Sequence, residues 1–173
     1  MKAIERLYMD IARAEADRHG VRVTKWRGKG SGYADPERRL VESERPSTLH
    51  GLSLFLHEVG HCVNGRILPV WWDEWIAWKY AIRRMEEEGL PSTIARELLK
   101  QNMEIEVNSA LRKGFVRYLP DWLIKEAGLD PGRARRRWDR RGRVKRMPDF
   151  WEPCPKCARR DHDRRKRRLL RKP

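Results

Sequence analysis

Apolar and polar residues follow two different periods in the first part of the chain. Between residues 2 and 19 apolar positions recur every three or four residues among charges, and Gly20 follows, which predicts an amphipathic helix. Residues 21–27 alternate apolar with polar side chains and include β-branched residues, which predicts a half-buried strand. Glycines at 28, 30 and 32 mark a loop or hairpin turn, and a second, weaker strand is expected at about 38–44.

The following residues return to a helical period. We predict helices at about 48–63, 73–88, 92–113 and 121–127. Ser47 is the expected N-cap of the first of these helices and Asp73 that of the second, and Gly65 and Gly89 mark their ends. The order of one helix, two or three strands and several further helices predicts an α+β fold with a small sheet.

The most apolar predicted helix, at 48–63, contains the sequence His57-Glu58-Val59-Gly60-His61. Residues four apart on a helix share a face, so both imidazoles can bind one Zn²⁺ ion at about 2.0–2.1 Å. Glu58 is rotated by about 100° from His57, which places its carboxylate beside the ion, where it can take a proton from water. We therefore predict His57 and His61 as metal ligands and Glu58 as the catalytic base. The alternative is a pair of core histidines held by hydrogen bonds.

A hydrolytic zinc site needs a third protein ligand and an open position for water. The next histidine after His61 is His162, so the third ligand must be acidic or come from far along the chain, and Glu74 is the candidate. Glu74, Ala77 and Ala81 form one stripe of the predicted helix at 73–88, and the small residues would let it approach the His57–His61 helix closely. Asp73 is the alternative ligand, although it fits the role of N-cap better.

Other residues near the motif have expected roles as well. Trp71, Trp75 and Trp78 are expected opposite the Glu74 stripe, in the core or in an interface, with a substrate subsite at Trp71 or Trp72 as the alternative. Cys62 is expected to be buried away from the metal. The donor that would stabilise the oxyanion stays open among Tyr80, His50 and Arg66. An edge strand near 38–44 could hold a substrate peptide by strand addition.

The motif at 57–61, followed by Glu74-x-x-Ala77-x-x-Tyr80-Ala81, resembles the ImmA/IrrE-type zinc metallopeptidases, a gluzincin family common in phages, mobile elements and bacteria. The resemblance covers about residues 1–113. It implies a zincin-like fold and peptide-bond hydrolysis, with His57, His61 and Glu74 as zinc ligands and Glu58 as general base. Characterised members act on transcriptional repressors bound to DNA, so the implied substrate is a DNA-associated regulator. The chain departs from the family in having Ile76 where an acidic residue is usual and a short loop between the ligand helices.

Charge divides the chain into two parts. The 173 residues carry a net charge of +15, and residues 131–173, with 19 basic and 5 acidic residues, account for +14 of it. We therefore predict a metallopeptidase domain at 1–130 and a basic, largely flexible tail at 131–173, which is too poor in large apolar residues to form a core. Three cysteines make no disulfide framework, and the chain has neither a secretory signal nor a run of about 20 apolar residues, so a cytoplasmic location is expected.

The tail carries two candidate binding features. Cys154, Cys157 and His162 have the spacing of a zinc knuckle, but Arg167 stands where the fourth ligand would fall, so the alternative is a reduced, exposed pair of cysteines. Arginine runs with interspersed aromatic residues predict contact with nucleic acid; an acidic protein, a membrane surface or a merely solubilising tail are the alternatives. The residues expected to make this contact are Arg135, Arg136, Arg137, Trp138, Arg140, Arg141, Arg165, Lys166 and Arg167.

Two other functions compete with a repressor-cleaving peptidase. One is a protease for DNA–protein crosslinks of the SprT type, which also joins this motif to a basic, cysteine-bearing tail but uses a histidine as third ligand. The other is a non-catalytic nucleic-acid-binding protein with a structural zinc, which would ordinarily have a fourth protein ligand and no need of Glu58.

Overall fold

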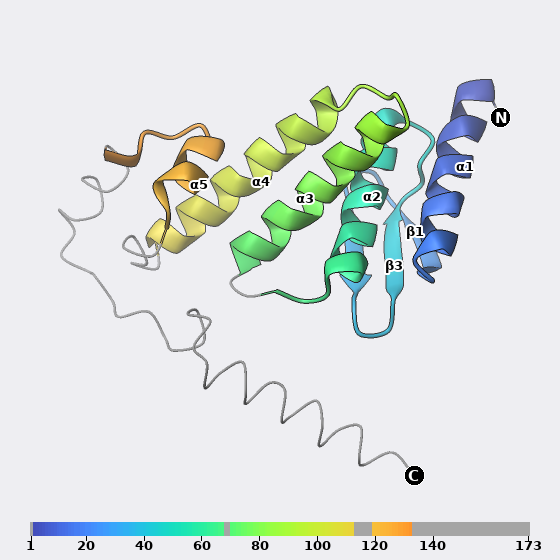
Figure 1. The fold of residues 1–173 in the computed structure, drawn as a ribbon, viewed down its shortest axis with the longest axis horizontal. Helices are drawn as coiled ribbons and strands as arrows, with labels where there is room; N and C mark the ends of the chain where they lie inside the picture. The colour runs from blue at the N-terminus through green and yellow to red at the C-terminus, as the bar shows by residue number, and fades with distance from the viewer. Residues whose placement is uncertain (1, 68–69, 113–118, 133–173) are drawn as a thin grey trace, which may run out of the picture.

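Helix α1, Ala3–Arg18, opens a fold that continues with three strands and four further helices in the computed structural model, which describes residues 2–67, 70–112 and 119–132 (Figure 1). The strands are β1 (Arg22–Arg27), β2 (Gly32–Asp35) and β3 (Leu40–Glu44). The later helices are α2 (Leu49–Asn64), α3 (Val70–Glu87), α4 (Thr93–Arg112) and α5 (Asp121–Glu126). The fold is α+β, as predicted, and no helix in the described ranges is both long and apolar enough to cross a membrane.

The sheet has the strand order β1-β3-β2, with β1 parallel and β2 antiparallel to β3. Gly32, which we expected in a loop or hairpin turn, begins β2, and residues 32–35 pair with β3 as a hairpin. Residues 40–44 therefore lie in the centre of the sheet, and the expectation of an edge strand near 38–44 is wrong. The hairpin brings β3 back between the two earlier strands, so the edges are β1 and β2.

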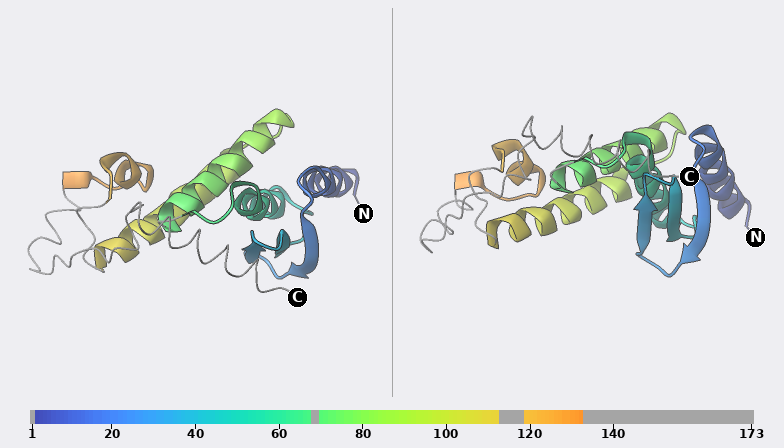
Figure 2. Two further views of the ribbon diagram at one scale, coloured as in Figure 1. Left: turned by 60° about the horizontal axis from the view of Figure 1, so that its bottom comes forward. Right: turned by 90° about the horizontal axis from the view of Figure 1, so that it is seen from below.

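Helix α2 is the centre of the molecule. It contacts α1, α3, α4, β2 and β3, and the sheet lies under it while α1 and α3 flank it (Figure 2). Residues on all sides of this helix are buried, as the high apolar content of the segment predicts, and four large side chains at i, i+3, i+4 and i+7 form a fully buried stripe along it. They are Leu52, Phe55, Leu56 and Val59, and Val41 of β3 is equally buried.

Two helix starts differ from the prediction. Thr48, not Ser47, is the N-cap of α2, and its hydroxyl accepts a hydrogen bond from the Gly51 amide at 3.0 Å. Helix α3 begins at Val70, so Asp73 lies within its first turn and is not a cap. The earlier start places Trp71 and Trp72 where their rings pack against Trp122 of α5, a contact that a loop at 66–72 would not form in this way.

A buried ion pair ties α1 to α3. Glu15 is 1% exposed and Arg84 6% exposed, and Arg84 Nε lies 3.0 Å from Glu15 Oε2. The hydroxyl of Tyr80 donates to Glu15 and lies 2.9 Å from His19 Nε2. Charges buried this deeply are tolerated because they are paired, and the pairs fix the position of α1 against α3.

Candidate metal centre

The three predicted ligands come together between α2 and α3. His57 Nε2 lies 3.1 Å from His61 Nε2 and 3.3 Å from Glu74 Oε2, and His61 Nε2 lies 3.6 Å from Glu74 Oε1. Both histidines are buried, and Glu74 is partly buried. Among the described residues, this is the group of side chains that could hold a metal ion.

These separations fit a bound ion. Two nitrogen or oxygen ligands, each about 2.0–2.1 Å from a tetrahedral metal ion, lie about 3.3 Å apart. The three measured separations, 3.1, 3.3 and 3.6 Å, scatter around that value. A tetrahedral ion held by these three side chains would keep one position for a further ligand.

Close packing of α2 against α3 positions Glu74. Ala77 and Ala81 are fully buried on α3, as the small-residue stripe predicts. The matching residue on α2 is Gly60, because a Cβ built there would lie 2.9 Å from the Ala77 carbonyl oxygen and 3.0 Å from its Cα. Gly60, the residue just before the second histidine of the motif, is therefore what allows α2 and α3 to pack in direct contact.

A second layer of side chains orients the ligands. Asp73 Oδ1 lies 3.3 Å from His61 Nδ1, so the alternative third ligand contacts the other nitrogen of that imidazole. The side-chain amide of Asn102 on α4 donates a hydrogen bond to Glu74. Trp78 stacks on the ring of His57, with centroids 4.1 Å apart and planes at 26°. Stacking takes the place of a hydrogen bond at His57, whose Nδ1 is buried and has no hydrogen-bond partner among the described residues.

The position of Trp78 corrects our expectation for the tryptophans. We expected Trp71, Trp75 and Trp78 opposite Glu74, but Trp78 follows Glu74 by one helical turn and faces the same neighbour, α2. The remaining tryptophans of α3 form an aromatic cluster with α5. In it, Trp72 stacks on Trp75 with centroids 5.3 Å apart, and Trp122 lies 5.1 Å from Trp75.

Burial and neighbouring charges shift the pKa of each of the three candidate ligands. Burial lowers the pKa of His57, despite its contact with Glu74, and so favours the neutral imidazole that a metal requires. Burial works to raise the pKa of Glu74, but the hydrogen bond with His57 and the charges of both imidazoles outweigh it, so the pKa lies below its ordinary value. For His61, burial is outweighed by Asp73 and Glu74, and the pKa is raised.

Glu58 lies beside the ligands without being one of them. Its side chain is 7% exposed, and burial raises its pKa to about 7, with the charge of His61 opposing the rise. Its carboxylate lies against Gly32, the first residue of β2, where an added Cβ would come within 2.1 Å of Glu58 Oε1. Gly32, which we took for a turn residue, therefore makes room for the carboxylate and places the edge strand β2 next to it.

The structure separates the candidate oxyanion donors from the site. The hydroxyl of Tyr80 is bound to Glu15 and His19 of α1, and His50 Nδ1 lies 3.2 Å from Glu44 Oε2 near the start of α2. Arg66 is exposed after the end of α2. Cys62 is buried, as predicted, and its Sγ lies 3.7 Å from the Leu40 carbonyl oxygen of β3.

Removing the carboxylate of Asp73 tests the second layer. We expect Asp73→Ala to weaken metal binding by about 10- to 100-fold, because His61 loses the group that orients its ring and increases its basicity. Competition with a chromophoric chelator measures the affinity, and Asp10→Ala, an exposed position on α1, is the matched control. Equal affinity of the wild type and Asp73→Ala would contradict the role of Asp73.

The candidate sites of the tail lie outside the described residues. This applies to the zinc-knuckle residues Cys154, Cys157 and His162 and to all of the predicted nucleic-acid contacts from Arg135 to Arg167.

In comparisons with known proteins, no family model, no curated protein and no solved structure matches the chain.

Proposed function

We propose that the chain is a zinc-dependent peptidase that hydrolyses peptide bonds of a protein substrate. The observation that carries the proposal is the convergence of His57, His61 and Glu74 at ligand-to-ligand separations of 3.1–3.6 Å, with the buried carboxylate of Glu58 beside them. Two imidazoles and one carboxylate with an open fourth position are a donor set of catalytic zinc. The motif resemblance to ImmA/IrrE-type metallopeptidases and their zincin-like fold supports the same proposal.

The residues of the chain would divide the work of hydrolysis. A zinc ion, if held by His57, His61 and Glu74, would supply a Lewis acid for the substrate carbonyl and for water, whose pKa such an ion lowers to about 7. Glu58 accepts the proton of the attacking water and passes it to the leaving amine. Burial raises the pKa of Glu58 to about 7 against the opposing charges of His61 and Arg27, and so keeps this carboxylate basic enough for the task.

Strand β2 is suited to present the substrate. It is an edge strand of the sheet, and its first residue, Gly32, adjoins Glu58. A substrate peptide paired with β2 would have its main chain held by hydrogen bonds next to the proposed base. The role first assigned to residues 38–44 thus passes to residues 32–35.

The two alternative functions receive less support from the site. A structural zinc would ordinarily have a fourth protein ligand, whereas the candidate group within the described residues has three members and Asp73 contacts the other nitrogen of His61. A crosslink protease of the SprT type would have a histidine at the third position, where this chain has Glu74. The basic residues after 130 favour a substrate associated with nucleic acid, such as a phage or mobile-element repressor.

Metal analysis and a cleavage assay test the proposal. We expect the purified chain to bind one zinc ion at this centre, with a second only if the cysteines of the tail form a knuckle, and His61→Ala to lose the first. The zinc-loaded chain is incubated with candidate DNA-bound regulators, with and without DNA, and fragments are identified by mass spectrometry. A chelator should abolish the fragments and added zinc should restore them. Iron in place of zinc, which the same donor set can bind, or cleavage that survives chelation, would contradict the proposal.

A further inference from the structure

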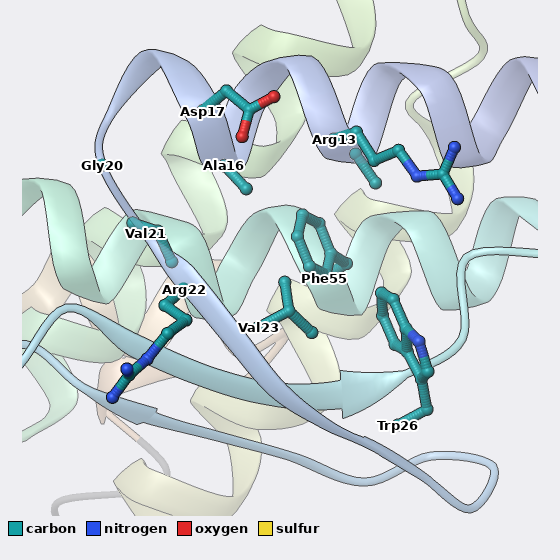
Figure 3. A pocket seen from close by; sticks show the side chains of 10 residues that line it. Arg13, Ala16, Asp17, Gly20, Val21, Arg22, Val23, Trp26 and Phe55 are labelled. Atoms are coloured by element: carbon teal, nitrogen blue, oxygen red, sulfur yellow. The ribbon is translucent and has the colours of Figure 1, made fainter.

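A groove lies between α1 and β1, away from the metal centre (Figure 3). It has a volume of about 560 Å³, which is within the range of ligand-binding pockets. Its apolar lining comes from α1, α2 and the β1 segment. These residues are Ala12, Ala16, Val21, Val23, Trp26 and Phe55.

The groove and the metal centre occupy opposite sides of α2. Phe55, which lines the groove, precedes His57 by two residues, and two residues correspond to a rotation of about 200° on a helix. The ring of Trp26 lies 6.0 Å from that of Phe55 and extends the apolar surface to the outside, where Trp26 is 40% exposed. A molecule bound in this groove would therefore leave the metal centre free.

A bulge in β1 gives the strand its apolar face. The pairing register with β3 shifts between Val23 and Lys25, so Thr24 is an extra residue. Without it, strand alternation would direct Val23 and Trp26 to opposite sides, whereas both line the groove. We predicted this strand to be half buried, yet five of its six residues are exposed. Strand β1 thus has an apolar face suited to packing, and the rest of the described chain leaves most of the strand exposed.

The outer edge of β1 can pair with a further strand. Strand β1 stands at one end of the order β1-β3-β2, so among the described residues it pairs with β3 alone. An edge strand beside a side-chain pocket is the arrangement that binds extended peptides, because main-chain hydrogen bonds give affinity and the pocket selects a side chain.

The charges around the groove select the peptide. Arg13 and Arg22 line it together with one acidic residue, Asp17, and the exposed Lys25 follows on β1. Cations on an edge strand disfavour pairing with a second copy of the same strand. They also disfavour the basic segment after residue 130, which carries a net charge of +14. An acidic strand is the partner that this edge would accept.

We propose that the groove between α1 and β1 binds an extended acidic peptide segment of a partner protein. The segment adds to the sheet as a strand on β1 and places an apolar side chain over Phe55, between Val23 and Ala16. Its acidic side chains lie near Arg13 and Arg22. The site would recruit a partner without contributing to the chemistry at the metal centre, so it does not depend on the proposed peptidase activity.

A defined peptide tests this site. The probe is a blocked, fluorescein-labelled peptide Glu-Val-Glu-Phe-Glu-Val-Glu, titrated with the full chain in the presence of EDTA and followed by fluorescence anisotropy. We expect binding that weakens at least tenfold when Phe is replaced by Ala in the peptide or when every Glu is replaced by Lys. On the protein, Arg13→Glu and Arg22→Glu should each weaken binding by about tenfold, a loss typical of charge reversal at a rim.

Two controls make the result specific. Lys125→Glu changes the net charge equally on the exposed side of α5, which packs against α4, and should leave the affinity within about twofold. Amide hydrogen exchange should slow at residues 22–27 when the peptide binds. The proposal would be overturned if the peptide did not bind, if the lysine peptide bound with equal affinity, or if Lys125→Glu weakened binding as much as the arginine variants do. Slower exchange at 32–35 in place of 22–27, or a dimer of the chain formed through β1, would overturn it as well.

Discussion

Glu58→Gln should reduce the rate of peptide hydrolysis by about 10²- to 10⁴-fold, the usual contribution of a general acid–base residue. Glutamine has nearly the same shape as glutamate, so it fits the space that Gly32 leaves open beside the side chain. It cannot accept the proton of the attacking water. Because the ligand atoms belong to His57, His61 and Glu74, metal affinity should stay within a few-fold of the wild type.

The matched control for this variant is Glu74→Gln. The two substitutions remove one carboxylate charge each from neighbouring positions of the same site, but Glu74 is the proposed ligand. We expect Glu74→Gln to lose metal and activity together, whereas Glu58→Gln loses activity alone. Metal affinity is measured by chelator competition and activity by the appearance of fragments. Full cleavage by Glu58→Gln would show that this carboxylate is not the base.

The parts of the site that follow from local geometry could be predicted from the sequence. His57, Glu58 and His61 lie within one helix, and a helix fixes the relation between residues one and four positions apart. The approach of Glu74 was predictable from the small residues Ala77 and Ala81, because two helices with such residues at their contact can pack closely. Helix periodicity likewise predicted each of the described helices to within a few residues.

The rest depends on contacts between segments that are far apart in the sequence. Nothing in the local sequence indicates that Gly32 lies against Glu58, or that Asn102 on α4 reaches Glu74. The position of Trp78 is a different kind of error, because a residue four positions after Glu74 shares its face wherever the helix begins, and the helical period alone would have placed Trp78 toward α2. The start of α3, which we fixed from Asp73, lies three residues earlier, where Trp71 packs on Trp122. The strand order required knowing that residues 32–35 pair with residues 40–43, a register set by the whole hairpin.

The proposed metal centre and the proposed peptide groove use different sides of α2. One side of α2 carries the histidines toward α3, and another side carries Phe55 toward α1 and β1. Because α2 is packed on all sides, its interior residues cannot change volume freely. A change at the α2–α3 contact should therefore affect the metal centre, whereas a change on the exposed face of β1 should affect only the groove.

Gly60→Ala tests that coupling at the point where the ligand helices touch. Alanine in place of glycine in a helix interior ordinarily stabilises a protein by about 0.5–1 kcal/mol. Here the new Cβ would lie 2.9 Å and 3.0 Å from backbone atoms of Ala77, which cannot rotate away as a side chain can. We therefore expect the sign to reverse, with a loss of about 1–3 kcal/mol in the free energy of unfolding and a larger loss for Gly60→Val.

The same substitution should weaken the metal centre, because Glu74 precedes Ala77 by three residues on α3 and must move with it. Relief of the contact requires a shift of several tenths of an ångström, whereas metal–ligand distances tolerate about ±0.2 Å. We expect metal affinity to fall at least tenfold and the rate to fall by up to about 10²-fold, as for other misplaced catalytic groups. Gly28→Ala is the control, since a Cβ there meets no atom within 4 Å. Thermal unfolding and chelator competition on both variants decide the matter: if Gly60→Ala kept the stability and metal affinity of Gly28→Ala, close contact at Gly60 would not be what holds Glu74 in place.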